Sequence, residues 1–343
     1  MPVRFRREQL QARFAIPDGA GTSVRSVEIR FDPLLGTTSR IAEGVKLQTA
    51  DEAALVCFQQ PDPNCPFCPE RIAQVTPCID PSVSREQRIR VGESVLFPNL
   101  VPYSRFAAVA VFTPKHWLSV AEFSPTLISD NLRACIRYIR EAYRFDPESR
   151  HCAWNINYLY PSGGSLPHPH SQVFLDPFPT TMMRFQFEAG QRYWAENRSC
   201  FWEDLVVAER ESQQRFLWEL GSTAWMTAFS PNGFNEVCAV VRGRETLLEI
   251  DDADIVSIST GVSRVLQWYG ATGYNSFNLT LFSGPLDGAS SFRVNLVMVT
   301  RAAMAPYYRN DSMHMERLHW EAAVDRAPEA IAAELRRYTS NAS

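Results

Sequence analysis

The chain has 343 residues, with 34 lysines and arginines against 38 aspartates and glutamates, a formal net charge of −4. This balance provides no basic surface for nucleic acid or for an anionic membrane, and no apolar run reaches the roughly 18 residues of a membrane-spanning helix. Hydrophobic residues make up 45% of the chain and charged residues 21%, which indicates a globular protein of one large or two ordinary domains.

We do not expect the N-terminal region to be an export signal. Residues 1–14 are rich in arginine and lack an apolar core, so we expect a cytoplasmic protein. Residues 26–31 follow with the alternation of a strand, and residues 32–36, Asp-Pro-Leu-Leu-Gly, are typical of a turn.

Eight cysteines are present, but only Cys65 and Cys68 form a close pair. In the sequence Cys-Pro-Phe-Cys, two thiolates can bind one tetrahedral Zn²⁺ at about 2.3 Å each. A redox pair is the alternative, although no thioredoxin-like βαβ pattern surrounds it. We expect the scattered remaining cysteines to be reduced thiols.

The middle of the chain alternates between strand and helix patterns. The apolar run 106–112 predicts a buried strand. Apolar residues at helical spacing predict a helix over about 124–143, opened by Ser-Pro. Residues 152–160 then alternate as a half-buried strand.

The second half repeats this order, with strands at 237–241, 274–282 and 292–299 and a helix over about 252–269. The order strand, helix, strand, loop, strand therefore predicts an internal duplication. For the tail, residues 319–336, we expect a helix, a turn at Ala327–Pro328 and a last helix.

One segment, 155–172, carries the strongest chemical signal. It holds two of the six histidines, His168 and His170, on either side of Pro169. In an extended segment, residues two apart point to the same face, so both imidazoles would project into one site. Residues 161–165 are typical of a flexible loop whose N–H groups can approach an anion. Phosphoryl chemistry is the interpretation we favour over two structural histidines.

This segment resembles the active-site signature of the galactose-1-phosphate uridylyltransferase family, a branch of the histidine-triad superfamily. The family pattern is an Asn, a small-residue loop with a Ser, and then Pro-His-Pro-His-Gly-Gln. The matching residues here are Asn157, Ser165, Pro167, His168, Pro169, His170 and Gln172, and Ser171 stands where Gly is common.

The resemblance implies an α+β fold of two tandem histidine-triad-like halves, each an antiparallel sheet with a packed helix. Residues 1–177 would carry the metal and the nucleophile, and residues 178–343 would lack the catalytic histidine. In the second copy, the His-Pro-His place is taken by residues such as Arg293, Asn295 and Val297. A homodimer is also expected, because such folds often dimerise.

By the same resemblance, His170 is the expected nucleophile, since a neutral imidazole attacks phosphorus well and leaves well when protonated. We expect a backbone carbonyl to fix its tautomer. Gln172 would stabilise charge on the phosphoryl oxygens. Asn157, Ser165 and the amides of Gly163 and Gly164 would contact phosphate.

Other motifs match the family pattern more locally. The run Phe97-Pro-Asn99 resembles its base pocket, and Arg40 is the candidate for a phosphate contact. The run Thr113-Pro-Lys-His116 matches its metal-binding segment. The implied ligands are Cys65, Cys68, His116 and His168. Four protein ligands leave no open position, so the resemblance implies a structural zinc.

The C-terminal half of such transferases often holds a second metal site, built from a Glu and several histidines. Residues 282–284 and 292–299 contain no histidine, so we expect that site to be absent. Surface or packing roles are expected for His151, His314 and His319.

Three functions remain open at this point. The first is transfer of a nucleotidyl group from a nucleoside-diphosphate sugar to a sugar 1-phosphate, by a ping-pong route through His170. The second uses inorganic phosphate as the acceptor, giving a nucleoside-diphosphate-sugar or dinucleoside-polyphosphate phosphorylase. The third is a non-catalytic, zinc-stabilised nucleotide-binding protein, which the intact His-Pro-His-Ser-Gln run disfavours.

Overall fold

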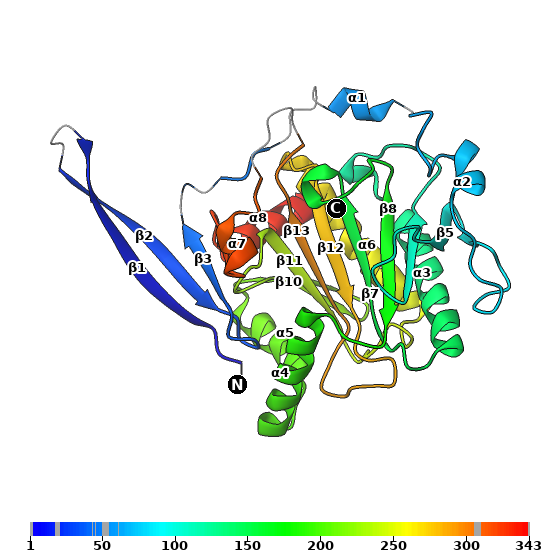
Figure 1. The fold of residues 1–343 in the computed structure, drawn as a ribbon. Coiled ribbons are helices and arrows are strands. Elements are labelled where there is room, and N and C mark those ends of the chain that lie inside the picture. Colours follow the sequence, from blue (N-terminus) through cyan, green and yellow to red (C-terminus); the bar gives the residue numbers. More distant parts are fainter. Residues whose placement is uncertain are drawn as a thin grey trace.

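The computed structural model describes residues 3–17, 21–42, 44, 46–49, 55–60, 62–304 and 310–341. Its centre is one ten-stranded antiparallel sheet (Figure 1). In spatial order the strands are β4 (Ile89–Val91), β5 (Ser94–Pro98), β6 (Phe106–Val111), β8 (His170–Asp176), β7 (His151–Tyr158), β12 (Phe277–Phe282), β13 (Asn295–Thr300), β11 (Phe234–Val241), β10 (Thr223–Thr227) and β9 (Phe216–Leu220).

The strand order is symmetric about the junction between β7 and β12. Reading outward, β7-β8-β6-β5-β4 on one side corresponds to β12-β13-β11-β10-β9 on the other. Equivalent hydrogen bonds fix the correspondence: Phe112 N donates to Pro169 O at 3.0 Å, and Val241 N donates to Val294 O at 2.9 Å. The predicted duplication is confirmed, and residues 168–172 correspond one to one with residues 293–297.

Two long helices, α3 (Pro125–Phe145) and α6 (Asp252–Ala271), contact each other and pack on the same face of the sheet. Each begins with a side-chain cap. Ser124 accepts a hydrogen bond from the backbone of Leu127, and Asp251 accepts one from that of Asp254. Both predicted helices are confirmed, and each continues two residues further than expected.

The opposite face, which we call the open face, is covered unevenly. Over the second half, α5 (Phe201–Ser212) packs through Phe201 and Trp202 against Met226 and Val240, and α4 (Thr181–Asn197) contacts α5. Over the first half lie the Cys65–Cys68 segment and α2 (Pro69–Val75), with a short helix α1 (Val56–Gln59) before it. The sequence patterns gave no prediction for α4 and α5.

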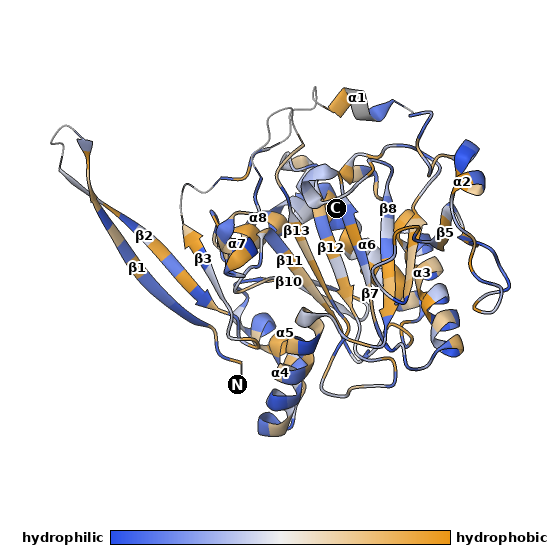
Figure 2. Cartoon of the chain, in the orientation of Figure 1, coloured by the Kyte–Doolittle hydropathy of each residue, from blue (hydrophilic) through white to orange (hydrophobic). Residues whose placement is uncertain are grey.

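A second, four-stranded sheet has the order β1 (Arg6–Ala15), β2 (Thr22–Phe31), β3 (Thr38–Ala42) and β14 (Ala322–Val324). The β1–β2 hairpin projects from the body and is mainly hydrophilic, whereas the strands of the large sheet are mainly hydrophobic (Figure 2). Every residue of β1 is exposed.

The tail differs from its predicted form. A helix is present at α7 (His314–Leu318), but the expected helix beginning at 319 is wrong, because residues 322–324 form β14 and pair in parallel with β3. Trp320, with φ 55°, turns the chain between the two elements. The last helix is α8 (Pro328–Asn341). None of the helices in the described ranges combines the length and apolarity needed to cross a bilayer.

Candidate active site

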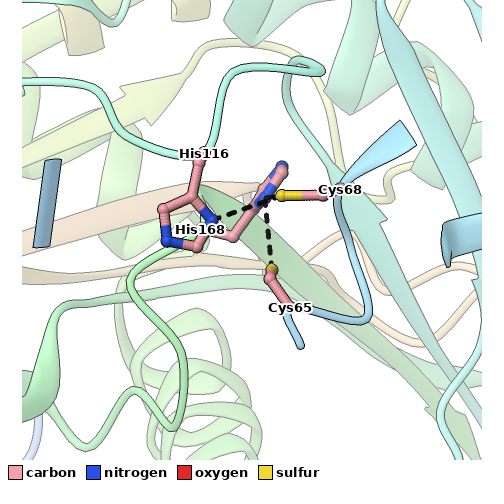
Figure 3. Close-up of side chains that lie close together, drawn as sticks. All are labelled: Cys65, Cys68, His116 and His168. Atoms are coloured by element: carbon pink, nitrogen blue, oxygen red, sulfur yellow. Dashed lines mark hydrogen bonds between the residues drawn. The ribbon is translucent and has the colours of Figure 1, made fainter. Parts of the chain in front are cut away.

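Four buried side chains from three separate segments meet beside the start of β8 (Figure 3). They are Cys65, Cys68, His116 and His168, and their candidate ligand atoms all lie within 4.8 Å of one another. Cys68 Sγ is 3.4 Å from His116 Nδ1 and 3.7 Å from His168 Nδ1, and Cys65 Sγ is 3.6 Å from His168 Nδ1. Ligands at 2.0–2.3 Å from a tetrahedral ion are separated by about 3.3–3.8 Å, so this group can hold a metal ion.

The protonation of the cluster suits a metal ion. His168 Nε2 lies 3.0 Å from the carbonyl oxygen of Thr113, which can only accept, so Nε2 carries the proton and Nδ1 faces the thiols with a free lone pair. Burial lowers the pKa of His168 to about 4, which keeps this ring neutral. Burial and the neighbouring Cys65 raise the pKa of Cys68 to about 12, which disfavours its thiolate. A bound cation would stabilise the thiolate and lower this pKa.

The second histidine of the motif is held in one tautomer by the first. His170 Nδ1 donates to the backbone carbonyl of His168 at 2.8 Å, so its Nε2 keeps the lone pair. The expected backbone acceptor is confirmed. Burial, opposed in part by this hydrogen bond, lowers the pKa of His170 and favours the neutral ring.

Phe67 connects the metal-binding group to His170, and the sequence patterns did not single it out. It lies between the two cysteines, and its ring meets that of His170 edge-on at 5.2 Å and that of Phe97 at 5.5 Å. The cysteine segment therefore positions the His170 ring as well as offering metal ligands.

Ser171, between His170 and Gln172, is held by α3 on the face of the sheet opposite the open face. The Ser171 hydroxyl donates to Asn131 Oδ1 of α3 at 2.5 Å, and Asn131 Nδ2 donates to the carbonyl of Ala110 on β6 at 2.9 Å. Both residues are fully buried. Ser171 thus has a structural role on the side of the sheet opposite the open face, and Asn131 is a second residue that sequence reasoning missed.

Gln172 lies on the open face, two residues beyond His170 on β8. Tyr103 donates to Gln172 Oε1 at 2.5 Å, which fixes the orientation of the amide. The amide nitrogen is then the end of Gln172 turned away from this contact, available to donate to a ligand oxygen.

Asn157 is oriented by a chain of hydrogen bonds from the second half. Arg301, paired with Asp311 through two contacts of 2.7 Å, donates to Asn278 Oδ1 at 2.7 Å. Asn278 Nδ2 must therefore be the donor to Asn157 Oδ1, at 2.6 Å, and it also donates to Ser162 O at 2.9 Å. This chain leaves the amide N–H groups of Asn157 for a ligand.

The loop before His168 departs from one expectation. The sequence predicts that the Gly163 and Gly164 amides contact phosphate, but here the backbone N–H of Gly163 donates to Tyr160 O and that of Gly164 to Leu159 O. The glycines instead permit the turn: Gly163 has φ 89°, and a Cβ on Gly164 would lie 2.9 Å from Asn157 O. Leu159 holds φ 67°, a strained conformation at the loop entrance. Ser165 is exposed in this loop.

The remaining candidate residues lie farther from the two histidines of the motif. Phe97 is buried in a cluster with Ile72 and Val109, and Asn99 follows at the end of β5, with its side chain accepting from Val101 N. Arg40 lies on β3, far from β8 in Figure 1, and pairs with Glu321 at 2.6 Å. Within one chain the structure does not bring Arg40 to the other candidates.

The other histidines contribute nothing to this group. His151 is buried at the opposite end of β7, and its ring lies 5.7 Å from that of Phe187. His314 and His319 are exposed and contact each other near α7.

Comparison with known proteins gives one relative in sequence. An uncharacterised protein of Archaeoglobus fulgidus is 31% identical over 340 residues, which cover 97% of this chain and 98% of that protein. The chain belongs to the same family as this archaeal protein. No family model matches the sequence.

Solved structures identify the architecture. A GalT-like protein from Arabidopsis thaliana has a TM-score of 0.70 at 18% identity, with 90% of this chain and 98% of that chain covered. An ADP-glucose phosphorylase from the same plant, with bound ADP-glucose, has the same score and coverage at 17% identity. A uridylyltransferase scores 0.67 at 18% identity, covering 92% and 99%. The predicted GalT-like, two-half α+β fold is confirmed.

Proposed function

We propose that the protein is a nucleotidyltransferase that forms a covalent nucleotidyl adduct on His170. The donor is a nucleoside-diphosphate sugar and the acceptor a sugar 1-phosphate. The single observation that carries the proposal is the 2.8 Å hydrogen bond from His170 Nδ1 to His168 O, which leaves Nε2 as a nucleophile on the open face.

In the first half-reaction, Nε2 attacks the α-phosphorus and the bond to the bridging oxygen breaks. The electron pair leaves with the sugar 1-phosphate. The amides of Gln172 and Asn157 donate to the phosphoryl oxygens, where charge increases. In the second half-reaction, an acceptor phosphate oxygen attacks the same phosphorus. The imidazole leaves readily because Nδ1–H stays hydrogen-bonded to His168 O.

A second candidate acceptor is inorganic phosphate. The fold matches an ADP-glucose phosphorylase as well as it matches the GalT-like protein, which supports keeping this alternative. Both candidates share the first half-reaction and differ only in the acceptor.

We further propose that Cys65, Cys68, His116 and His168 bind a structural Zn²⁺. All four positions of a tetrahedral ion would be occupied by protein, so the ion would brace the fold. Because His168 also supplies the carbonyl that orients His170, the metal site supports the nucleophile indirectly.

The test is to incubate the protein with UDP-, ADP- and GDP-sugars radiolabelled in the α-phosphate, and to look for an acid-labile protein adduct. We expect an adduct in the wild type. Adding sugar 1-phosphates or inorganic phosphate to the isolated adduct then identifies the acceptor. Absence of any adduct with all donors would favour the non-catalytic nucleotide-binding alternative.

A further inference from the structure

A cavity of about 360 Å³ lies on the open face of the second half. Its floor is formed by β12, β13 and β11, and α4 and α5 form the opposite wall together with residues 32–35. The proposed transfer reaction assigns no role to this cavity. It lies directly beside the proposed phosphate site, because its floor residues Asn278 and Thr280 hydrogen-bond to Asn157 and Asn155.

The walls of this cavity are mainly apolar. Large side chains that line it include Leu34, Met182, Phe201, Trp202, Leu205 and Phe282. The charged residues in the lining are Asp32, Glu209 and Glu236, with no lysine or arginine. A phosphate group would therefore be disfavoured here, and a neutral or cationic group would be accepted.

The polar atoms in the lining call for a ligand with hydrogen-bond donors. Gln186 Oε1 is buried without a hydrogen-bond partner in the described part of the chain. Asn295 donates its Nδ2 to Arg293 O, which leaves its Oδ1 for another donor. Glu209 is already paired with Arg215 at 2.9 Å. An unmatched buried acceptor costs about 1–3 kcal/mol, so a ligand N–H or O–H would be favoured.

The internal duplication shows how this surface changed. The position of Gln172 in the first half corresponds to Val297 in the second, and that of His170 to Asn295. Val297 and Val299 face the cavity from β13. The strip that binds phosphate in one half is thus an apolar floor in the other.

The distances fit a substrate that spans both surfaces. Neighbouring strands lie about 4.8 Å apart, so β13 is about 14 Å from β8 across the sheet. An α-phosphate at His170 and a β-phosphate at Asn157 would leave the next group at β12, at the edge of the cavity. The base would lie on the other side of His170, near Phe97.

We propose that the cavity holds the sugar of the donor, and that this sugar carries an apolar substituent, such as the C6 methyl of a 6-deoxy sugar or the methyl of an N-acetyl group, besides at least one N–H or O–H donor. The inference rests on the proposed function, because it places the diphosphate between His170 and Asn157. It narrows the substrate class beyond nucleoside-diphosphate sugars in general.

The experiment compares matched donors that share the nucleotide and differ in the sugar. UDP- and ADP-glucose are compared with their 6-deoxyglucose and N-acetylglucosamine counterparts, measuring kcat/KM for release of the sugar phosphate. We expect a preference of about tenfold or more for at least one of the two sugars that carry a methyl-bearing substituent. Equal rates, or a preference for glucose, would overturn the proposal.

Val297→Phe fills the cavity from its floor and should reduce that preference at least about fivefold. Gln186→Met should lower kcat/KM more for the glucose nucleotides, which keep the C6 hydroxyl, than for the 6-deoxyglucose nucleotides, which lack it. Val207→Phe is the control, because Val207 is exposed on α5 and does not line the cavity. A change of equal size in the control and in Val297→Phe would contradict the assignment.

Calorimetric binding of the same donors to His170→Asn separates the two proposals. If no adduct forms in the wild type but the donors with 6-deoxyglucose or N-acetylglucosamine still bind more tightly than those with glucose, and Val297→Phe removes that difference, the sugar site stands and the transfer reaction fails. If adducts form but the donors do not differ in rate or in binding, the transfer reaction stands and the sugar site fails.

Discussion

The two halves of the large sheet have the same strand order and opposite chemistry on the open face. In the first half, the segment His168–Gln172 is held by the cysteine segment above it and by Asn131 of α3 below it. In the second half, Asn295 and Val297 of the corresponding segment Arg293–Val297 line a mainly apolar cavity that α4 and α5 cover. The backbone is shared, so the difference arises from a few side chains and from what covers them.

This comparison teaches that the orientation of His170, the proposed nucleophile, depends on three supports rather than on the strand alone. The equivalent strand exists twice, but only one copy has the His168 carbonyl, the Phe67 ring and the orienting chain through Asn278. The second half contributes by orienting Asn157, which lies across the junction between the halves. The following predictions test this division of roles.

The largest effect is expected from removing His170, the proposed nucleophile. His170→Asn should abolish the adduct and lower turnover by at least about 10⁴-fold, because no other described group offers a lone pair at that place. Adduct formation and steady-state rates measure this. His319→Asn, the same change at an exposed histidine near α7, should behave as the wild type.

The next effect concerns the metal-binding group. Cys65→Ala should abolish the proposed zinc binding and lower the melting temperature by about 5–10 °C, because the three remaining buried ligands would no longer hold the ion. Metal analysis and calorimetry measure both. Cys78→Ala, at an exposed cysteine outside the group, should keep the metal. Retention of zinc in Cys65→Ala would contradict the ligand set.

A smaller effect is expected from breaking the chain that orients Asn157. Asn278→Asp can still accept from Arg301 but can no longer donate to Asn157, so kcat/KM should fall about 30-fold, or about 2 kcal/mol. Thr280→Val, on the same strand and face, removes a donor to Asn155 and should cost clearly less. Steady-state kinetics distinguish the two, and equal losses would remove the special role of Asn278.

The smallest effect concerns stability. Glu329 on α8 pairs with Arg30 at 2.8 Å and with Arg215 at 2.7 Å. Burial opposes ionisation, but these arginines lower the pKa of Glu329 to about 2, below its usual 4.5. The stability it contributes is present above about pH 4.5 and is lost as the pH falls toward 2.

Glu329→Gln should therefore lower the free energy of unfolding by about 2 kcal/mol at pH 7, and by progressively less below pH 4.5. Denaturant titrations at several pH values measure the difference between variant and wild type. A difference that stays constant down to pH 3 would show that the charge of Glu329 does not carry the effect.

Much of the fold was predictable, because long elements carry clear periodicity. The helices α3 and α6 have capping residues and apolar spacing, and the repeated order of strands indicated the duplication. The spacing of Cys65 and Cys68 and the pattern His-Pro-His also led to residues that the structure brings together. The strand β14 was missed, because its three residues depend on pairing with the distant β3.

The remaining site features are set by contacts that no local pattern encodes. Phe67 contacts His170, about 100 positions away, and Asn131 contacts Ser171, about 40 positions away. The orientation of Asn157 depends on Arg301. The loop glycines suggested backbone N–H groups that are free to bind phosphate, but these N–H groups form the hydrogen bonds of the turn. Local residue type indicated flexibility there, and only the full backbone shows which hydrogen bonds are used.

The single ladder of hydrogen bonds across β7 and β12 has a consequence for how the molecule is maintained. If the two copies separated, each would present a bare strand edge able to recruit other chains, which is a known route to aggregation. The pairing of β7 with β12 therefore protects the inner strand edges of both halves from other chains.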